Sequence, residues 1–153
     1  MDTVIRNGAV VTPQATFIAD VGITGEQVEA VGTRLHAPVE LDATGCYVLP
    51  GAVDPHVHLQ MPLGPHRSSD TFSSGTIAAA LGGTTTVIDF VEPAQDMRFH
   101  HALEARCQEA DGAVAVDYGL HMMVPAWHAD RDEELENLRD VVADGVPSFK
   151  LYM

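Results

Sequence analysis

Two histidines separated by one residue end the short apolar stretch from Gly51 to His58. Side chains alternate between faces along an extended strand, so His56 and His58 are expected on the same side. Two imidazoles in that arrangement can share one metal ion. A chain with eight histidines can also produce this spacing by chance, and capping or core packing is then the alternative interpretation.

The only lysine of the chain, Lys150, lies in the apolar segment Ser148–Met153. Because an unpaired ammonium group is costly in apolar surroundings, such a position favours the neutral, nucleophilic amine. That amine can react with carbon dioxide to form a carbamate, whose two oxygens can bridge two metal ions. A solvent-exposed lysine is the alternative.

The composition is that of a globular protein whose 153 residues, 46% of them hydrophobic, can bury one sizeable core. Eight basic and 22 acidic residues give a net charge of −14, which argues against nucleic acid or an anionic membrane as the partner. No signal-peptide layout and no apolar run of roughly 18 residues is present, so we expect a cytoplasmic protein. Cys46 and Cys107 form no CxxC pattern and are expected to be ordinary thiols.

Residues 3 to about 32 alternate short β-type runs with turn signals. Asn7-Gly8 is a typical two-residue hairpin signal, and further runs follow up to residue 32. This pattern predicts a small antiparallel β unit. Pro50-Gly51 then marks the boundary with the second region, residues 51–153.

The second region alternates strand-like and helix-like segments. Strands are expected near 52–58, 84–90, 114–121 and 147–152. Helices are expected over 70–81, from about Asp96 with Phe99 and Leu103 on one face, and from Asp130 with a capping partner at Glu133. The helix from Asp130 also has an apolar stripe, made of Leu135, Leu138, Val141 and Val142. The strands are continuous apolar runs, which is typical of parallel strands covered on both faces.

Four βα-type strands make half of an eight-stranded barrel. Chemistry in such barrels collects where the strands end, at the C-terminal face. The residues expected at or near these ends are His56, His58, Asp89, His121 and Lys150. The fold class is therefore α/β.

Five segments occur in the order found in one family: Gly51–Pro62, Ser69–Thr76, Gly82–Phe90, Asp117–His121 and Ser148–Met153. Through them the chain resembles the cyclic amidohydrolases, and within these the dihydropyrimidinase and D-hydantoinase family. The resemblance implies the first half of a (β/α)8 TIM-type metallo-hydrolase barrel in residues 51–153. It also implies that residues 1–50 are the N-terminal part of a β-sandwich domain.

The resemblance also implies a two-zinc site. His56 and His58 would bind the first zinc ion, and Lys150, as N6-carboxylysine, would bridge both. Met61 and Leu63 would belong to one loop that lines the substrate pocket, and residues 92–97 to another. Two further histidines, an aspartate and a tyrosine of such enzymes have no counterpart up to Met153.

The implied reaction is zinc-dependent hydrolysis of the cyclic amide bond of hydantoins or dihydropyrimidines, which yields N-carbamoyl amino acids and belongs to pyrimidine catabolism. The substrate is a small molecule, and the complete enzyme is expected to be a homotetramer. Allantoinases and dihydroorotases share the His-x-His and the lysine, so one of these activities is an alternative. A second alternative is a non-catalytic truncated half-barrel or a subunit of an assembly.

Other polar residues are assigned structural or solvated roles. Asp54, Asp89 and His121 are expected to form structural hydrogen bonds. Trp127, Met122 and Met123 are expected to pack in the interior. The remaining histidines, which we expect in solvent, are His36, His66, His100, His101 and His128.

We expect the 153-residue chain alone to show no hydantoinase activity in the presence of added zinc and bicarbonate, because part of the implied ligand set is missing from it. A spectrophotometric hydantoin-opening assay on the purified monomer checks this. Measurable turnover would contradict the interpretation of the chain as one part of the catalytic unit.

Overall fold

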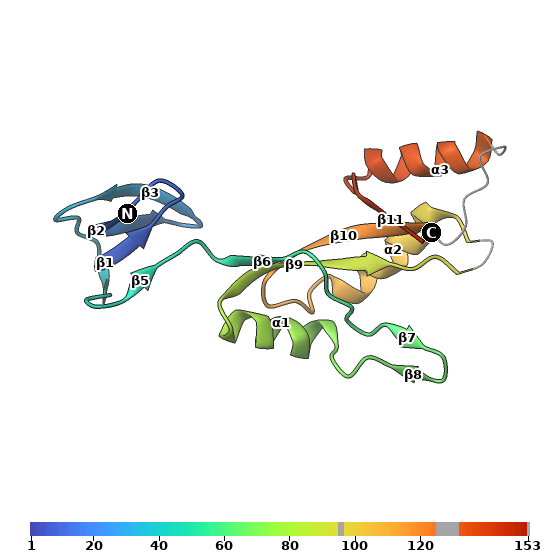
Figure 1. The fold of residues 1–153 in the computed structure, drawn as a ribbon, viewed down its shortest axis with the longest axis horizontal. Helices are drawn as coiled ribbons and strands as arrows, with labels where there is room; N and C mark the ends of the chain where they lie inside the picture. Colours follow the sequence, from blue (N-terminus) through green and yellow to red (C-terminus); the bar gives the residue numbers. More distant parts are fainter. Residues whose placement is uncertain (95–96, 125–131, 153) are drawn as a thin grey trace. The chain divides into compact units, whose positions relative to one another are not determined.

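The computed structural model describes residues 1–94, 97–124 and 132–152. They form two compact units, Met1–Pro50 and Gly51–Met153 (Figure 1). No helix within these ranges is long and apolar enough to cross a membrane.

The first unit is a five-stranded mixed sheet. Its strands are β1 (Thr3–Val11), β2 (Thr16–Thr24), β3 (Gln27–Gly32), β4 (Val39–Asp42) and β5 (Tyr47–Val48). The order is β3-β2-β1-β4, and β5 also pairs with β1. β1, β2 and β3 are antiparallel neighbours, but β4 and β5 run parallel to β1. The antiparallel pattern predicted up to residue 32 is therefore confirmed, whereas beyond it the chain returns twice to the free edge of β1 in the parallel direction.

Asn7-Gly8 does not form the predicted hairpin turn, because β1 continues through both residues. Asn7 has a φ of 60°, and the pairing of β1 with β2 shifts register between Ile5 and Gly8. The left-handed conformation thus serves a β-bulge instead of a turn. The Asn7 backbone N–H donates to the Asp20 carboxylate at 2.9 Å, which satisfies the group that the bulge leaves unpaired.

The second unit contains a four-stranded sheet in the order β11-β10-β9-β6. The strands are β6 (Ala52–Asp54), β9 (Thr84–Val91), β10 (Asp117–Val124) and β11 (Phe149–Leu151). All neighbours are parallel, as predicted. A separate two-stranded ribbon is made of β7 (Pro62–Leu63) and β8 (His66–Arg67). Closure of an eight-stranded barrel and the β-sandwich remain predictions.

Three helices accompany this sheet: α1 (Phe72–Leu81), α2 (Phe99–Ala110) and α3 (Asp132–Ala143). α1 begins at Thr71, whose hydroxyl accepts from the Ser74 backbone in a capping box. Phe99 and Leu103 are buried on α2, as predicted. The predicted cap Asp130 lies outside the described residues, as do His128, Trp127 and the side chains of Glu133 and Leu135.

The core of the second unit lies between the sheet and helices α2 and α3. β9, β10, α2 and α3 contribute buried side chains to one cluster, including Val91, Met122, Phe99, Leu103 and Val141. On the opposite face of the sheet, Val53 is 58% exposed and Ile88 is half-buried. Among the described residues, helices cover one face only, but Phe90 and Met123 are buried on the other, so the prediction of two covered faces is met in part.

The predicted stripe on α3 is met in part. Val141 is fully buried, and Leu138 packs against the same cluster, but Val142 is 47% exposed. Met122 and Met123 are buried in β10, as expected.

An ion pair joins the start of α2 to the turn after α3. His100 Nδ1 lies 2.7 Å from Asp144 Oδ2. His100 is exposed, as predicted, but it is paired rather than only solvated. The Asp144 carboxylate raises the pKa of His100 above its ordinary value.

A raised folded-state pKa makes this pair a pH-dependent stabiliser. Its contribution is complete below the unfolded pKa of about 6.5 and is lost as the pH rises through the higher folded value. We expect His100→Gln to lower the free energy of unfolding in urea at low pH and to leave it unchanged at high pH. His101→Gln, at the exposed neighbouring position, is the control, and an equal effect of both variants would contradict the role of the pair.

Candidate metal centre

His56 and His58 do not project from a strand as predicted, because β6 ends at Asp54. The segment after it is held to β9 by the Val57 N–H, which donates to the Ile88 carbonyl at 3.2 Å. The two rings nevertheless converge, with 3.3 Å between their Nε2 atoms. The His56 N–H donates to the Asp54 carboxylate at 3.1 Å, which gives Asp54 the structural role expected of it.

The Phe90 ring is the common surface on which the candidate groups gather. His58 stacks on it at 4.6 Å between centroids, and His56 and His121 lie at 4.9 and 5.1 Å. Lys150 Nζ lies 4.4 Å from the same centroid, in a cation–π contact. Phe90 itself is buried, with 6% of its surface exposed. Four nitrogen-bearing side chains from three segments of the chain therefore meet over one ring.

Lys150 is half-buried. Its exposure is therefore intermediate between the two predictions, a buried lysine and a solvent-exposed one. Besides Phe90, its ammonium group faces the Tyr152 ring at 5.5 Å. Its position in the sheet follows from pairing with Met123 of β10.

The histidine pair fits a zinc ion. Nitrogens at the usual zinc distance lie about 3.3–3.4 Å apart when the ion is tetrahedral, which matches the 3.3 Å between the two Nε2 atoms. Burial, followed by the charges of Lys150 and His56, lowers the pKa of His58. This favours the neutral imidazole that binds metal.

The pair alone is not a complete site. Within residues 1–94, 97–124 and 132–152, no group of three or more His, Cys, Asp or Glu side chains is arranged to hold a metal ion. His121 is engaged through both ring nitrogens, with Ser148 Oγ at 2.6 Å and the Pro55 carbonyl at 3.0 Å. That arrangement agrees with the structural role expected of His121.

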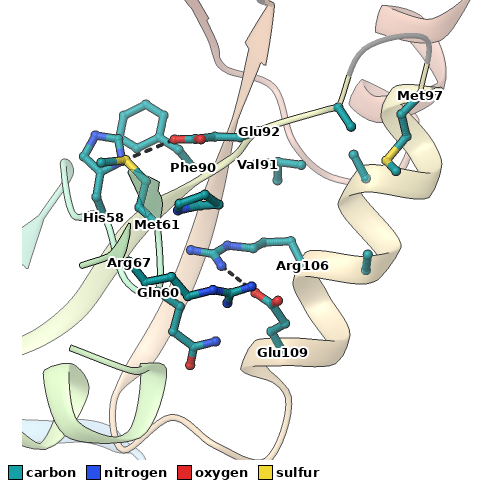
Figure 2. Close-up of a pocket in the computed structure, with 14 residues that line it drawn as sticks. His58, Gln60, Met61, Arg67, Phe90, Val91, Glu92, Met97, Arg106 and Glu109 are labelled. Atoms are coloured by element: carbon teal, nitrogen blue, oxygen red, sulfur yellow. Dashed lines mark hydrogen bonds and ion pairs between the residues drawn. The ribbon is translucent and has the colours of Figure 1, made fainter. Parts of the chain in front are cut away.

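Glu92, directly after β9, faces the outer side of His58. Its Oε1 lies 3.9 Å from His58 Nδ1, as the dashed line in Figure 2 marks. A carboxylate on that side favours the tautomer with the proton on Nδ1 and the lone pair on Nε2.

A cavity of about 210 Å³ adjoins His58 on the side of α2 (Figure 2). Met61 from one predicted substrate loop and Glu92 and Met97 from the other line it together. Leu63 lies outside this lining, in β7, and is 50% exposed. Part of the second loop, residues 95–96, lies outside the described residues.

Asp89 points away from Phe90 and is fully buried among the helices. It accepts hydrogen bonds from the Leu59 N–H and from Arg106, so its structural role is as predicted. Burial raises the pKa of Asp89, and the Arg106 guanidinium opposes that shift.

Sequence reasoning missed Phe90 and Arg106. Phe90 could have been found from its place at the end of a strand, next to Asp89 on the alternate face. Arg106 has one local partner, Glu109, but the two that give it this role, Asp89 and Leu59, lie 17 and 47 residues away in the chain, where no local pattern indicates them.

These features place the chain in a known class. The model of the amidohydrolase family matches residues 47–151, and the chain belongs to that family. Its relatives include the D-hydantoinase of Geobacillus stearothermophilus, 41% identical over 100% of this chain and 32% of the relative. The dihydropyrimidinase of Rattus norvegicus is 39% identical over 97% of this chain and 30% of the relative. The chain thus spans about a third of the length of these curated relatives.

Solved structures agree with the fold. The dihydropyrimidinase from Brevibacillus agri matches with a TM-score of 0.93 and 45% identity, over 100% of this chain and 33% of that chain. The D-hydantoinase from Bacillus sp. AR9 has a TM-score of 0.93 and 42% identity, over 99% of this chain and 33% of that chain. The predicted family resemblance is confirmed, and the parallel sheet matches the corresponding half-barrel of hydantoinases.

Removing the Phe90 ring should destabilise the second unit. We expect Phe90→Ala to cost about 3–5 kcal/mol of unfolding free energy, because a buried aromatic side chain is lost. Tyr152→Ala is the matched control, since that ring also faces Lys150 but is 62% exposed. Its effect should stay within about 0.5 kcal/mol. Equal losses of unfolding free energy in urea titrations of the two variants would show that packing of the Phe90 ring does not stabilise the second unit.

Proposed function

We propose that this chain is the N-terminal part of a zinc-dependent cyclic amidohydrolase that opens hydantoins or dihydropyrimidines to N-carbamoyl amino acids. One observation carries the proposal: His56, His58 and Lys150 meet over the Phe90 ring, and the Nε2 atoms of the histidines are spaced for one zinc ion. The names of the relatives, D-hydantoinase and dihydropyrimidinase, support the substrate class.

In this proposal His56 and His58 would hold the first zinc ion, and Lys150, as a carbamate, would supply an anionic oxygen ligand. The carbamate would form when the neutral Nζ attacks the carbon of carbon dioxide: an N–C bond forms, the electron pair of one C=O π bond moves to its oxygen, and the nitrogen releases a proton to solvent. When bound, the two ions supply a nucleophile at neutral pH and polarise the amide carbonyl. The complete enzyme is proposed to be a homo-oligomer.

Residues of this chain orient the proposed ligands. The Glu92 carboxylate, 3.9 Å from His58 Nδ1, attracts a proton to that nitrogen and so favours an unprotonated Nε2 on the side of His56. His121 binds the Pro55 carbonyl and so restrains the segment directly before His56. Met61 and Met97 give the adjoining cavity apolar walls, which suit the ring of a small cyclic amide or its substituent.

In the complete enzyme that carries this chain, we expect Lys150→Ala to lose nearly all bound metal, because the bridging anion cannot form. Metal analysis by mass spectrometry measures the zinc content, and carbon-13 NMR after labelling with bicarbonate detects the carbamate carbon. Arg67→Ala removes another cation near the cavity and is the control, with unchanged zinc content. Two zinc ions per chain in Lys150→Ala would refute the carbamate role.

Substrate class is tested by comparing ring opening of hydantoin, dihydrouracil, allantoin and dihydroorotate by the same complete enzyme. We expect the highest kcat/KM for hydantoin or dihydrouracil. Preferential turnover of allantoin or dihydroorotate would instead support one of the alternative activities. Zinc binding without turnover of any of the four would support the non-catalytic alternative.

A further inference from the structure

Leu59, directly after His58, is held at both of its backbone polar groups. Its N–H donates to Asp89 Oδ1 at 3.4 Å. Its carbonyl accepts a hydrogen bond from Arg106, and the same guanidinium nitrogen also donates to Asp89 Oδ2. Leu59, Asp89 and Arg106 are thus each hydrogen-bonded to the other two. The backbone of Leu59 is held between a residue of strand β9 and a residue of helix α2.

The Leu59 side chain is also anchored. It is 7% exposed and packs with Phe72 of α1 and Ala110 of α2. A Cβ added at Gly75 would lie 2.4 Å from Leu59 Cδ2, so the side chain occupies the space that this glycine leaves. Leu59 therefore cannot shift without disturbing the contacts between both helices.

This anchor matters because the histidine segment is outside the sheet. β6 ends at Asp54, and the segment between the strand and Leu59 is tied down by the Val57 N–H and by the contact of His121 with the Pro55 carbonyl. Leu59 is the next anchored position after His58. A change in its position would move the His58 Nε2 atom relative to that of His56.

We propose that Arg106 and Asp89 are positioning residues for the His56–His58 pair, acting through the backbone of Leu59. The inference rests on the proposed function for the role of that pair, and it assigns Arg106, on α2, a part in metal binding without direct contact with the metal.

The local chemistry explains why an arginine is needed. Its planar fork can donate in several directions at once, whereas a lysine ammonium on a flexible stem has no such fixed geometry. Arg106 lies over the Phe72 ring at 4.5 Å and is 12% exposed, so its guanidinium is held in place by packing. Its other terminal nitrogen pairs with Glu109, as Figure 2 shows.

The first test measures the zinc affinity of the complete enzyme that carries this chain, after its metal has been removed, by competition with a chromophoric chelator. We expect Arg106→Lys to weaken binding by about 10- to 100-fold, the range for residues that orient metal ligands. Glu109→Gln removes the other partner of Arg106 without touching Leu59, and should leave the affinity unchanged. Leu103→Ala, a buried position one turn before Arg106 on α2 that makes no hydrogen bond to Leu59, controls for lost stability. Wild-type affinity in Arg106→Lys, or an equal loss in Leu103→Ala, would overturn the proposal.

The second test needs no metal. NMR of the metal-free chain should show a nuclear Overhauser effect between the ring protons of His56 and His58, which is lost in Arg106→Lys and kept in Glu109→Gln and Leu103→Ala. Its persistence in Arg106→Lys would overturn the positioning role. If the wild-type chain keeps this contact but the complete enzyme that carries it binds no zinc, the proposed function fails while the positioning of the pair stands.

Discussion

The parallel register of the four-stranded sheet is the constraint on which the rest of the second unit depends. Residues paired across parallel strands share a face, and every second residue of a strand returns to it. Phe90 pairs with His121, and Met123, two residues further on, pairs with Lys150. The ring, the imidazole and the ammonium therefore lie on one face. A register shift of one residue would move one of them to the helix side.

The same alternation directs Phe90 and Asp89, neighbours at the end of β9, to opposite faces of the sheet. Phe90 faces the candidate ligands, and Asp89, its neighbour, faces the helices, where it is fully buried and paired with Arg106. A buried carboxylate without a partner is costly, so Asp89 ties α2 to the sheet at the position where the histidine segment passes. Ligand geometry and helix packing are thus coupled through adjacent residues of one strand.

The part of the chain that matches the amidohydrolase family is the part that carries the candidate metal ligands. The amidohydrolase match begins at residue 47, near the boundary between the two units, and runs to residue 151, within β11. It therefore covers the sheet that carries the candidate ligands. The described residues provide a pair of convergent imidazoles and one lysine, but no arrangement of three metal-ligating side chains. The half-barrel sheet is established, while the two-zinc chemistry remains a proposal.

The sequence by itself determined the order of strands and helices in the second unit, because apolar runs and capping residues are local signals. It also identified the His-x-His and the sole lysine, whose residue types limit their chemistry. Only the tertiary structure decided that Asn7-Gly8 forms a bulge, since the partner that makes the bulge favourable, Asp20, comes from β2. The roles of Phe90 and Arg106 likewise depend on partners distant in the chain. Contacts of that kind arise from packing, which no local pattern of residues encodes.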